Sequence, residues 1–142
     1  MKTMTAVFAV TTSNAGESVV LTTDNVNFLQ GAGGEGLEIN GVINITPGAT
    51  TTAVVLRVRR GVGTGGAIVG SSPTFPVTAG AQSTLTYDIM DAAPPVTPIV
   101  TPTGADSPPT AQYTVTVQQT GGTAAGTVSY ATGGIQPITT GW

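Results

Sequence analysis

The chain contains neither cysteine nor histidine among its 142 residues, and both absences restrict the chemistry that it can perform. Without cysteine it can form no disulfide bond and no cysteine-ligated zinc site. Without histidine, nucleophilic catalysis of the Ser-His-Asp or Cys-His kind is excluded as well. The one lysine, Lys2, lies next to the first residue. The sequence therefore predicts a protein that is not an enzyme and that binds no cofactor.

Charge is also scarce. Charged residues make up 8% of the chain, whereas about 25% is usual in globular domains. The formal net charge is -3 and the carboxylates are scattered, so the sequence has neither the basic patch that binds nucleic acid nor an acidic tail. A surface so poor in charge favours association. We expect a homo-oligomer with no nucleic-acid partner.

Long apolar runs are missing too. No stretch approaches the roughly 18 apolar residues that a membrane helix needs, so we expect no membrane partner. The segment Met1 to Val10 superficially resembles the apolar centre of a signal peptide, but threonines interrupt it, and we expect no cleaved leader. The length fits one domain with a substantial core. We therefore expect a single domain over residues 1–142.

What the chain does contain is β-branched residues in alternating patterns, separated by glycine and proline turns. In the stretch Thr51 to Gly61, Val54, Leu56 and Val58 alternate with Val55, Arg57 and Arg59, which predicts a central strand with one buried row and the arginines opposite. Other strands are expected at Thr5 to Thr12, Glu17 to Thr23, Leu37 to Thr46, Ala67 to Gly70, Thr74 to Thr78, Ser83 to Asp91, Tyr113 to Gln118 and Ala125 to Thr132. No segment has a helical period.

About eight short strands with Gly/Pro turns predict an all-β, antiparallel β-sandwich, first of all a jelly roll, with an Ig-like sandwich and then a barrel as alternatives. We expect the strand from Leu37 to lie beside the arginine strand, with Gly41 as a bulge or bend. In the strands expected at Ser83 to Asp91 and at Tyr113 to Gln118, the alternation puts Tyr87 and Tyr113 on the inward rows, so we expect both tyrosines in the core.

Two segments do not fit this alternation. Ala92 to Pro109 carries six prolines, too many to pair regularly with a sheet, and predicts an extended arm that is mobile in the free protein and ordered on a partner. Gly133 to Trp142 is rich in glycine and proline and predicts an extended C-terminal tail. With Met1 to Thr5, these segments are expected to carry most contacts to neighbouring subunits.

Three patterns could indicate a ligand site, and each favours a simpler interpretation. Gly31 to Gly36 matches GxGxxG, but a strand follows it where a helix N-terminus is needed for pyrophosphate. Asp88 and Asp91 would point to opposite faces of their strand, as solvated acids that share no metal or catalytic role. Neither Glu35 with Glu38 nor Asp24 with Asn25 has the spacing of a calcium loop. We expect no metal.

The three arginines are candidate partner-binding residues. Arg57, Arg59 and Arg60 are the only concentrated positive charge in the chain. They either form a solvated face balanced by Glu38 or Asp88 across the sheet, or contact an acidic partner, because planar guanidinium groups suit interface carboxylates.

Apolar residues outside the strands are further candidates for partner contacts. Trp142 either anchors in a neighbour's pocket or packs on its own sandwich, since tryptophan is enriched at interface hot spots. Val96, Ile99 and Val100 are the apolar residues of the proline-rich arm, which we expect to become buried on oligomerisation.

Three runs resemble small virion proteins of tailed bacteriophages, the capsid decoration or cement proteins: VVLRVRRG at residues 54–61, TAG at 78–80 and YTVTVQQTG at 113–121. The resemblance covers roughly Thr46 to Thr132. It implies a β-sandwich or jelly roll that sits on the outer surface of an icosahedral capsid, as a trimer in the first place or a dimer. It further implies that the protein stabilises the shell by bridging subunits of the major capsid protein, with no active site.

A second class of function remains open. A sandwich of this kind could be a carbohydrate- or receptor-binding module of a phage fibre or a cell surface. Exposed Trp and Tyr side chains around a cleft would favour that alternative, whereas ordered termini and a long apolar arm favour assembly.

Overall fold

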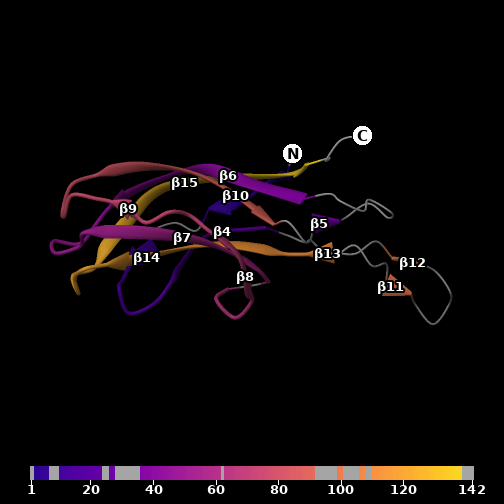
Figure 1. Cartoon of the computed structure of the whole chain (residues 1–142), viewed down its shortest axis with the longest axis horizontal. Coiled ribbons are helices and arrows are strands. Elements are labelled where there is room, and N and C mark those ends of the chain that lie inside the picture. The colour runs from indigo at the N-terminus through magenta and orange to yellow at the C-terminus, as the bar shows by residue number, and fades with distance from the viewer. Residues whose placement is uncertain are drawn as a thin grey trace.

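A computed structural model of the chain describes residues 2–6, 10–23, 26–27, 36–61, 63–91, 99–100, 106–107 and 110–138. Over these residues it is built from strands alone, which form two antiparallel sheets packed as a β-sandwich (Figure 1). The described residues include no helix long and apolar enough to cross a membrane. The prediction of an all-β sandwich is therefore confirmed.

The first sheet has the strand order β1-β15-β6-β10, and β3 also pairs with β15. Its strands are β1 (Lys2–Thr3), β3 (Val10–Thr12), β6 (Gly36–Thr46), β10 (Ser83–Asp91) and β15 (Gly126–Ile138). The second sheet has the order β2-β4-β14-β7-β8, and β9 also pairs with β7. Its strands are β2 (Thr5–Ala6), β4 (Ser18–Thr22), β7 (Ala53–Arg60), β8 (Ala67–Ser71), β9 (Phe75–Pro76) and β14 (Tyr113–Thr120).

The strand order identifies the topology. The strands of three or more residues are, in chain order, β3, β4, β6, β7, β8, β10, β14 and β15. In space the first, eighth, third and sixth of them form one sheet, and the second, seventh, fourth and fifth form the other. This interleaved order is that of a jelly roll, built from two Greek keys. Of the three predicted architectures, the jelly roll is the one that the chain adopts.

The core lies between the two sheets. In β7, Val54, Leu56 and Val58 are fully buried, as the alternation predicted. The inward rows of the other long strands meet them in one cluster, which includes Ile39, Ile43, Ile45, Leu85, Tyr87, Ile89, Tyr113, Val115 and Val117. Burial raises the pKa of the Tyr87 and Tyr113 phenols. Both tyrosines are core residues, as predicted.

Tyr87 reaches across its neighbouring strand. Its hydroxyl donates a hydrogen bond of 3.0 Å to the backbone carbonyl of Thr132 in β15. On the way it passes Gly41, which is paired with Tyr87 on one side and with Gly133 on the other. A Cβ on Gly41 would collide with the Thr132 carbonyl. The pairing of β6 continues without a bulge at Gly41. Of the two alternatives predicted at Gly41, a bulge or a bend, the bulge is therefore wrong, and the glycine permits a close backbone approach.

Two further predictions, on the position of one strand and on the C-terminal tail, are also wrong. The strand β6 lies between β10 and β15 and not beside the arginine strand β7, which pairs with β14, β8 and β9. The predicted C-terminal tail from Gly133 is part of β15 as far as Ile138, because it pairs along β6 and Gly134 also pairs with β1. Residues Lys2–Thr3 are the edge strand β1 and belong to the sandwich.

The proline-rich segment Ala92 to Pro109 contains a short ladder of its own. Within it β11 (Ile99–Val100) pairs with β12 (Asp106–Ser107), and just after it β13 (Thr110–Ala111) pairs with β5 (Val26–Asn27). Both small ladders lie toward one end of the sandwich (Figure 1). Among the described residues of the segment, β11 and β12 pair with each other and with no strand of the two large sheets.

Candidate interaction surfaces

Arg59 is bound to an acid on the outer face of the second sheet. Its Nε donates to Glu17 Oε1 at 3.1 Å, and its Nη2 forms an ion pair with Glu17 Oε2. Arg59 Nη1 donates to the Gly66 carbonyl at 2.5 Å, and Thr116 Oγ1 donates to Glu17 Oε1 at 2.5 Å. The hydrogen bond from Arg59 is the main cause that lowers the pKa of Glu17. The group is a bidentate pair in which each of the three guanidinium nitrogens of Arg59 has a partner inside the chain.

Arg57 and Arg60 are likewise engaged within the molecule. Arg57 Nη1 donates to Gln118 Oε1 at 2.7 Å on the neighbouring strand β14. Arg60, the last residue of β7, turns toward the first sheet and forms an ion pair with Asp91 at 2.6 Å. Tyr113 Oη donates to the same Asp91 oxygen at 2.7 Å. We call Arg60, Asp91 and Tyr113 the intersheet clamp, because it joins the ends of β7, β10 and β14.

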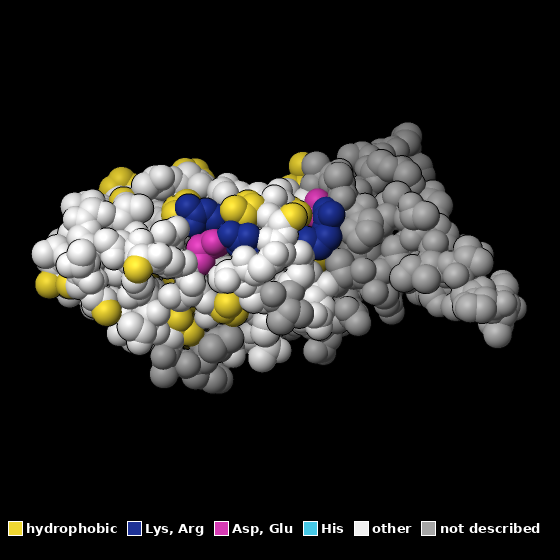
Figure 2. All heavy atoms as spheres, turned by 90° about the horizontal axis from the view of Figure 1, so that it is seen from below, with side chains coloured by type: hydrophobic (Ala, Val, Ile, Leu, Met, Phe, Trp, Pro, Cys, Tyr) yellow, Lys and Arg dark blue, Asp and Glu magenta, His cyan; other side chains and the backbone are white. Residues whose placement is uncertain are grey.

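These contacts revise two expectations. The acids that balance the arginines are Glu17 and Asp91, and not Glu38 or Asp88. Asp88 and Asp91 do point to opposite faces of β10, as predicted, but Asp91 is buried and is no solvated strand-end acid. In Figure 2 the basic side chains lie beside acidic ones, on a face whose remaining atoms are mostly neutral. Contact of the arginines with an acidic partner stays a prediction.

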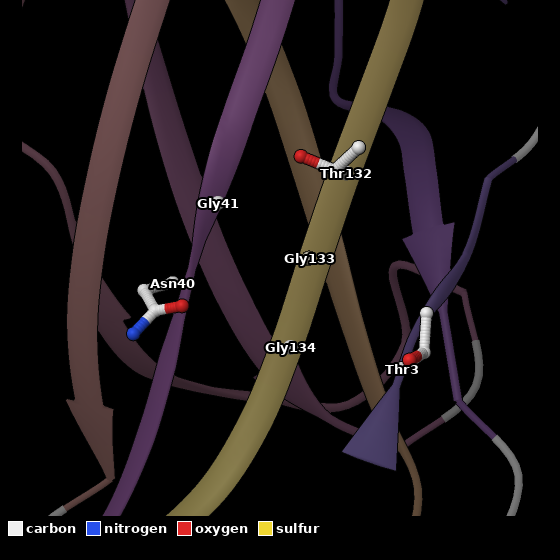
Figure 3. Close-up of a pocket in the computed structure, with 6 residues that line it drawn as sticks. All are labelled: Thr3, Asn40, Gly41, Thr132, Gly133 and Gly134. Carbon is white, nitrogen blue, oxygen red and sulfur yellow. The ribbon is translucent and has the colours of Figure 1, made fainter. Parts of the chain in front are cut away.

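The outer face of the first sheet carries a row of mainly polar residues that the sequence did not reveal. The register places Thr3, Gly134, Asn40 and Asp88 side by side on β1, β15, β6 and β10. Because the outward position of Gly134 has no side chain, this row is interrupted in the middle. The result is an open hollow of about 240 Å³ lined by Thr3, Asn40, Gly41, Thr132, Gly133 and Gly134 (Figure 3). We call it the glycine hollow.

Tyr130 lies on the same face, one outward position beyond Thr132. It is 56% exposed and directly opposite Asn44. Thr132 Oγ1 accepts a hydrogen bond of 3.3 Å from the Val42 backbone amide, and Asn44 Oδ1 accepts one of 3.4 Å from Thr84. The face therefore presents one exposed aromatic ring among amide and hydroxyl groups.

At the other side of the hollow two carboxyl groups lie close together. Asn40 Nδ2 donates to Glu38 Oε1 at 3.1 Å. Desolvation, and then a hydrogen bond and charge repulsion with Glu38, raise the pKa of Asp88. No group of three or more acids that could hold a metal ion occurs in the described ranges.

Sequence reasoning missed this face because Gly133 and Gly134 were interpreted as strand breakers. The available signal was the register: once the tail is aligned with β6, Gly133 and Gly134 fall opposite Gly41 and Asn40. Tyr130 was not singled out, because its row begins after a bulge between Val128 and Tyr130 that reverses the alternation.

Several predicted sites fall on residues outside the described part of the chain. Val96 and Trp142 lie there entirely, and for Ile99 and Val100 the structure gives only the backbone pairing of β11. The GxGxxG loop also lies outside, apart from Gly36, which begins β6 and so agrees with the expectation that a strand follows the motif.

Comparisons with known proteins give similarity of fold only. No family model and no curated protein matches the chain. Two chains of similar structure come from the structures of infectious bursal disease virus, Gx strain (17% identity, TM-score 0.48) and Gt strain (12% identity, TM-score 0.49). They cover 98% and 96% of this chain, which spans only 33% and 32% of theirs. Because both TM-scores are below 0.5, these similarities carry no argument about function.

Proposed function

We propose that the protein is a structural component of a virion, which decorates the outer surface of an icosahedral phage capsid and cements it by bridging major capsid protein subunits. The observation that supports this most is the jelly-roll strand order of the two sheets, an architecture that recurs in viral capsid domains. Since one fold serves many functions, the surface of the molecule must also suit assembly.

The surface of the second sheet meets that requirement. Arg57, Arg59 and Arg60 have their partners inside the chain, so covering this face leaves no guanidinium group without a partner. An unpaired charge buried at an interface is costly.

A bridging protein also needs a segment that can reach neighbouring subunits, and we propose the proline-rich segment Ala92 to Pro109 for that role. Asp91 is the last residue before Ala92 to Pro109, and Tyr113 follows shortly after it. The bond between Asp91 and Tyr113 therefore fixes both ends of the segment to the sandwich. We propose that this segment contacts the shell and that the protein acts as a homo-oligomer, a trimer first of all.

Binding to isolated shells tests the proposal. Purified protein is mixed with capsids assembled from the major capsid protein alone and is sedimented with them. The proposal predicts saturable binding at a fixed ratio to the capsid subunits, and a higher disruption temperature of the decorated shells. Protein that stays in the supernatant at all concentrations would contradict it.

The carbohydrate- or receptor-binding alternative also has a specific observation in its favour. Exposed Trp and Tyr side chains around a cleft are the feature expected of such a module, and the exposed Tyr130 lies one outward position from Thr132, which lines the glycine hollow. The two functions use different parts of the molecule, so a decoration protein could carry both.

A further inference from the structure

The outer face of the first sheet combines three features that the capsid proposal does not use. Tyr130 is exposed at one end of a row on β15, Thr132 follows it, and Gly134 opens the hollow at the next outward position. With about 3.3 Å between successive strand residues, these three positions span roughly 13 Å. That length suits a ligand of two or three small rings laid along β15.

We propose that this face binds a neutral saccharide. Tyr130 serves as the stacking platform for one pyranose ring, and the glycine hollow receives a hydroxymethyl or N-acetyl group of the next. The proposal is independent of the capsid role, because it rests on the first sheet and not on the arginine strand or the proline-rich segment.

The aromatic ring is the first argument for a saccharide. A pyranose has an apolar C–H face that packs on an aromatic ring, and a tyrosine offers an apolar body with a polar tip. Tyr130 is one of only three large hydrophobic residues exposed in the described part of the chain, with Ile68 and Met90. It is the only aromatic among these three, and its neighbours in the register on this face include Asn44 and Thr132.

The hydrogen-bonding groups are the second argument. Sugar hydroxyls need both donors and acceptors, and amide side chains supply both from one residue. Within the described residues, Asn40 uses its Nδ2 on Glu38 and Asn44 uses its Oδ1 on Thr84. The Asn40 carbonyl oxygen and the Asn44 amino group are therefore available, one on each side of the Thr132 position.

The charge of the face decides between neutral and charged ligands. The three arginines all belong to β7 in the second sheet, whereas Glu38 and Asp88 lie beside Asn40 in the first. An anionic ligand such as a sialylated or phosphorylated sugar would meet these carboxylates without a matching guanidinium group. A neutral sugar can instead use them as hydrogen-bond acceptors.

The hollow explains why glycine is needed at position 134. A Cβ there would project outward between Thr3 and Asn40, into the space that the ligand substituent occupies. Gly41 and Gly133 form the floor of the hollow, and they are glycines for a different reason. A Cβ on Gly133 would point inward and meet Tyr87, Leu21 and Met4 in the core. Gly134 is therefore the position at which a side chain would block binding.

The test is an NMR titration of the labelled full-length protein with maltose, lactose and chitobiose. At least one sugar is expected to shift the backbone amides of Tyr130, Thr132 and Gly134 saturably, with a Kd in the millimolar range. Tyr130→Ala should weaken binding about tenfold, a loss that corresponds to one good aromatic contact. Tyr130→Phe should retain binding, because it keeps the ring.

Two further variants distinguish a loss of binding at this site from a loss of folding. Gly134→Val should abolish binding by filling the hollow, and the unshifted amide spectrum of the second sheet shows whether the variant is folded. Met90→Ala removes an exposed apolar side chain from the far corner of the same face and should bind like wild type. The proposal is overturned if none of the three sugars shifts these amides at about 50 mM, or if Tyr130→Ala binds as well as wild type.

Discussion

The Tyr113 hydroxyl lies 2.7 Å from Asp91 Oδ2, and this hydrogen bond joins the two ends of the proline-rich segment. Asp91 is almost fully buried and also receives Arg60 Nη2 at 2.6 Å, so one carboxylate connects strands of both sheets. A buried carboxylate needs such partners, because its charge has lost its water. The clamp thus stabilises the sandwich at the point where the chain enters the proline-rich segment.

Removing the carboxylate should destabilise the fold. Asp91→Ala leaves the buried Tyr113 hydroxyl and the Arg60 guanidinium without their shared acceptor, which we expect to lower the free energy of unfolding by about 2–4 kcal/mol. Urea unfolding followed by tyrosine fluorescence measures the change. Asp88→Asn serves as the control, since it alters an exposed carboxyl on the same strand and should not destabilise. Comparable losses in both variants would show that the clamp has no special role.

The two faces of β7 should respond differently to truncation. Leu56→Ala empties a fully buried position and should cost about 2–5 kcal/mol. Arg57→Ala removes a partly exposed side chain whose bond to Gln118 is a surface contact, and should cost about 1 kcal/mol or less. Thermal or urea unfolding of the two variants in parallel gives the comparison, and equal losses would contradict the assignment of the faces.

Gly41 should tolerate no side chain. Gly41→Ala places a Cβ against the Thr132 carbonyl, the atom that accepts the Tyr87 hydrogen bond, and overpacking of this kind costs about 1–3 kcal/mol. Gly16→Ala is the matched control, because a Cβ at Gly16 meets nothing within 4 Å. The melting temperature should fall for the first variant and stay nearly constant for the second. A Gly41 variant as stable as wild type would argue against the close approach of β6 and β15.

Acid should weaken the pair of Glu17 and Arg59. The pKa of Glu17 is lowered in the folded state from its ordinary 4.5, chiefly by the Arg59 hydrogen bond. The folded state therefore binds this proton less tightly than the unfolded state, so the stabilisation is complete above pH 4.5 and is lost as the pH falls through the lower folded value. Unfolding at a series of pH values should show a steeper acid loss in wild type than in Glu17→Gln. Identical pH profiles would exclude a contribution from this pair.

The sequence predicted those parts of the fold that depend on local alternation. The buried rows of β7 and β10 follow directly from their period of two, and β10 has the predicted bounds Ser83 to Asp91. In β14 the inward row is also as predicted, but Thr114 and Thr116 on the opposite row are buried as well. The C-terminal part of β15 could not be predicted in this way, because Gly133, Gly134 and Pro137 have poor strand propensity. Their long pairing with β6 outweighs that local preference.

The contacts of the surfaces were harder to predict, since they join residues far apart in the chain. Arg59 finds Glu17 and Arg60 finds Asp91 only after the sandwich has formed. The glycine hollow depends on the register of three strands, in which a one-residue shift would replace Gly134 by an inward residue. Neither alternation nor composition contains that information.

The capsid proposal depends most on the proline-rich segment, and deleting Val96 to Thr103 tests it directly. The deletion removes β11 but leaves Asp91 and Tyr113 in place, so unfolding of the purified variant should show an intact sandwich. Particles that carry this variant are then heated beside wild-type particles and undecorated ones, and their disruption temperatures are compared. We expect the variant particles to break at a lower temperature than wild type, close to that of undecorated shells. If they withstand heating as well as wild-type particles do, the protein does not cement the capsid through this segment, and the central proposal is wrong.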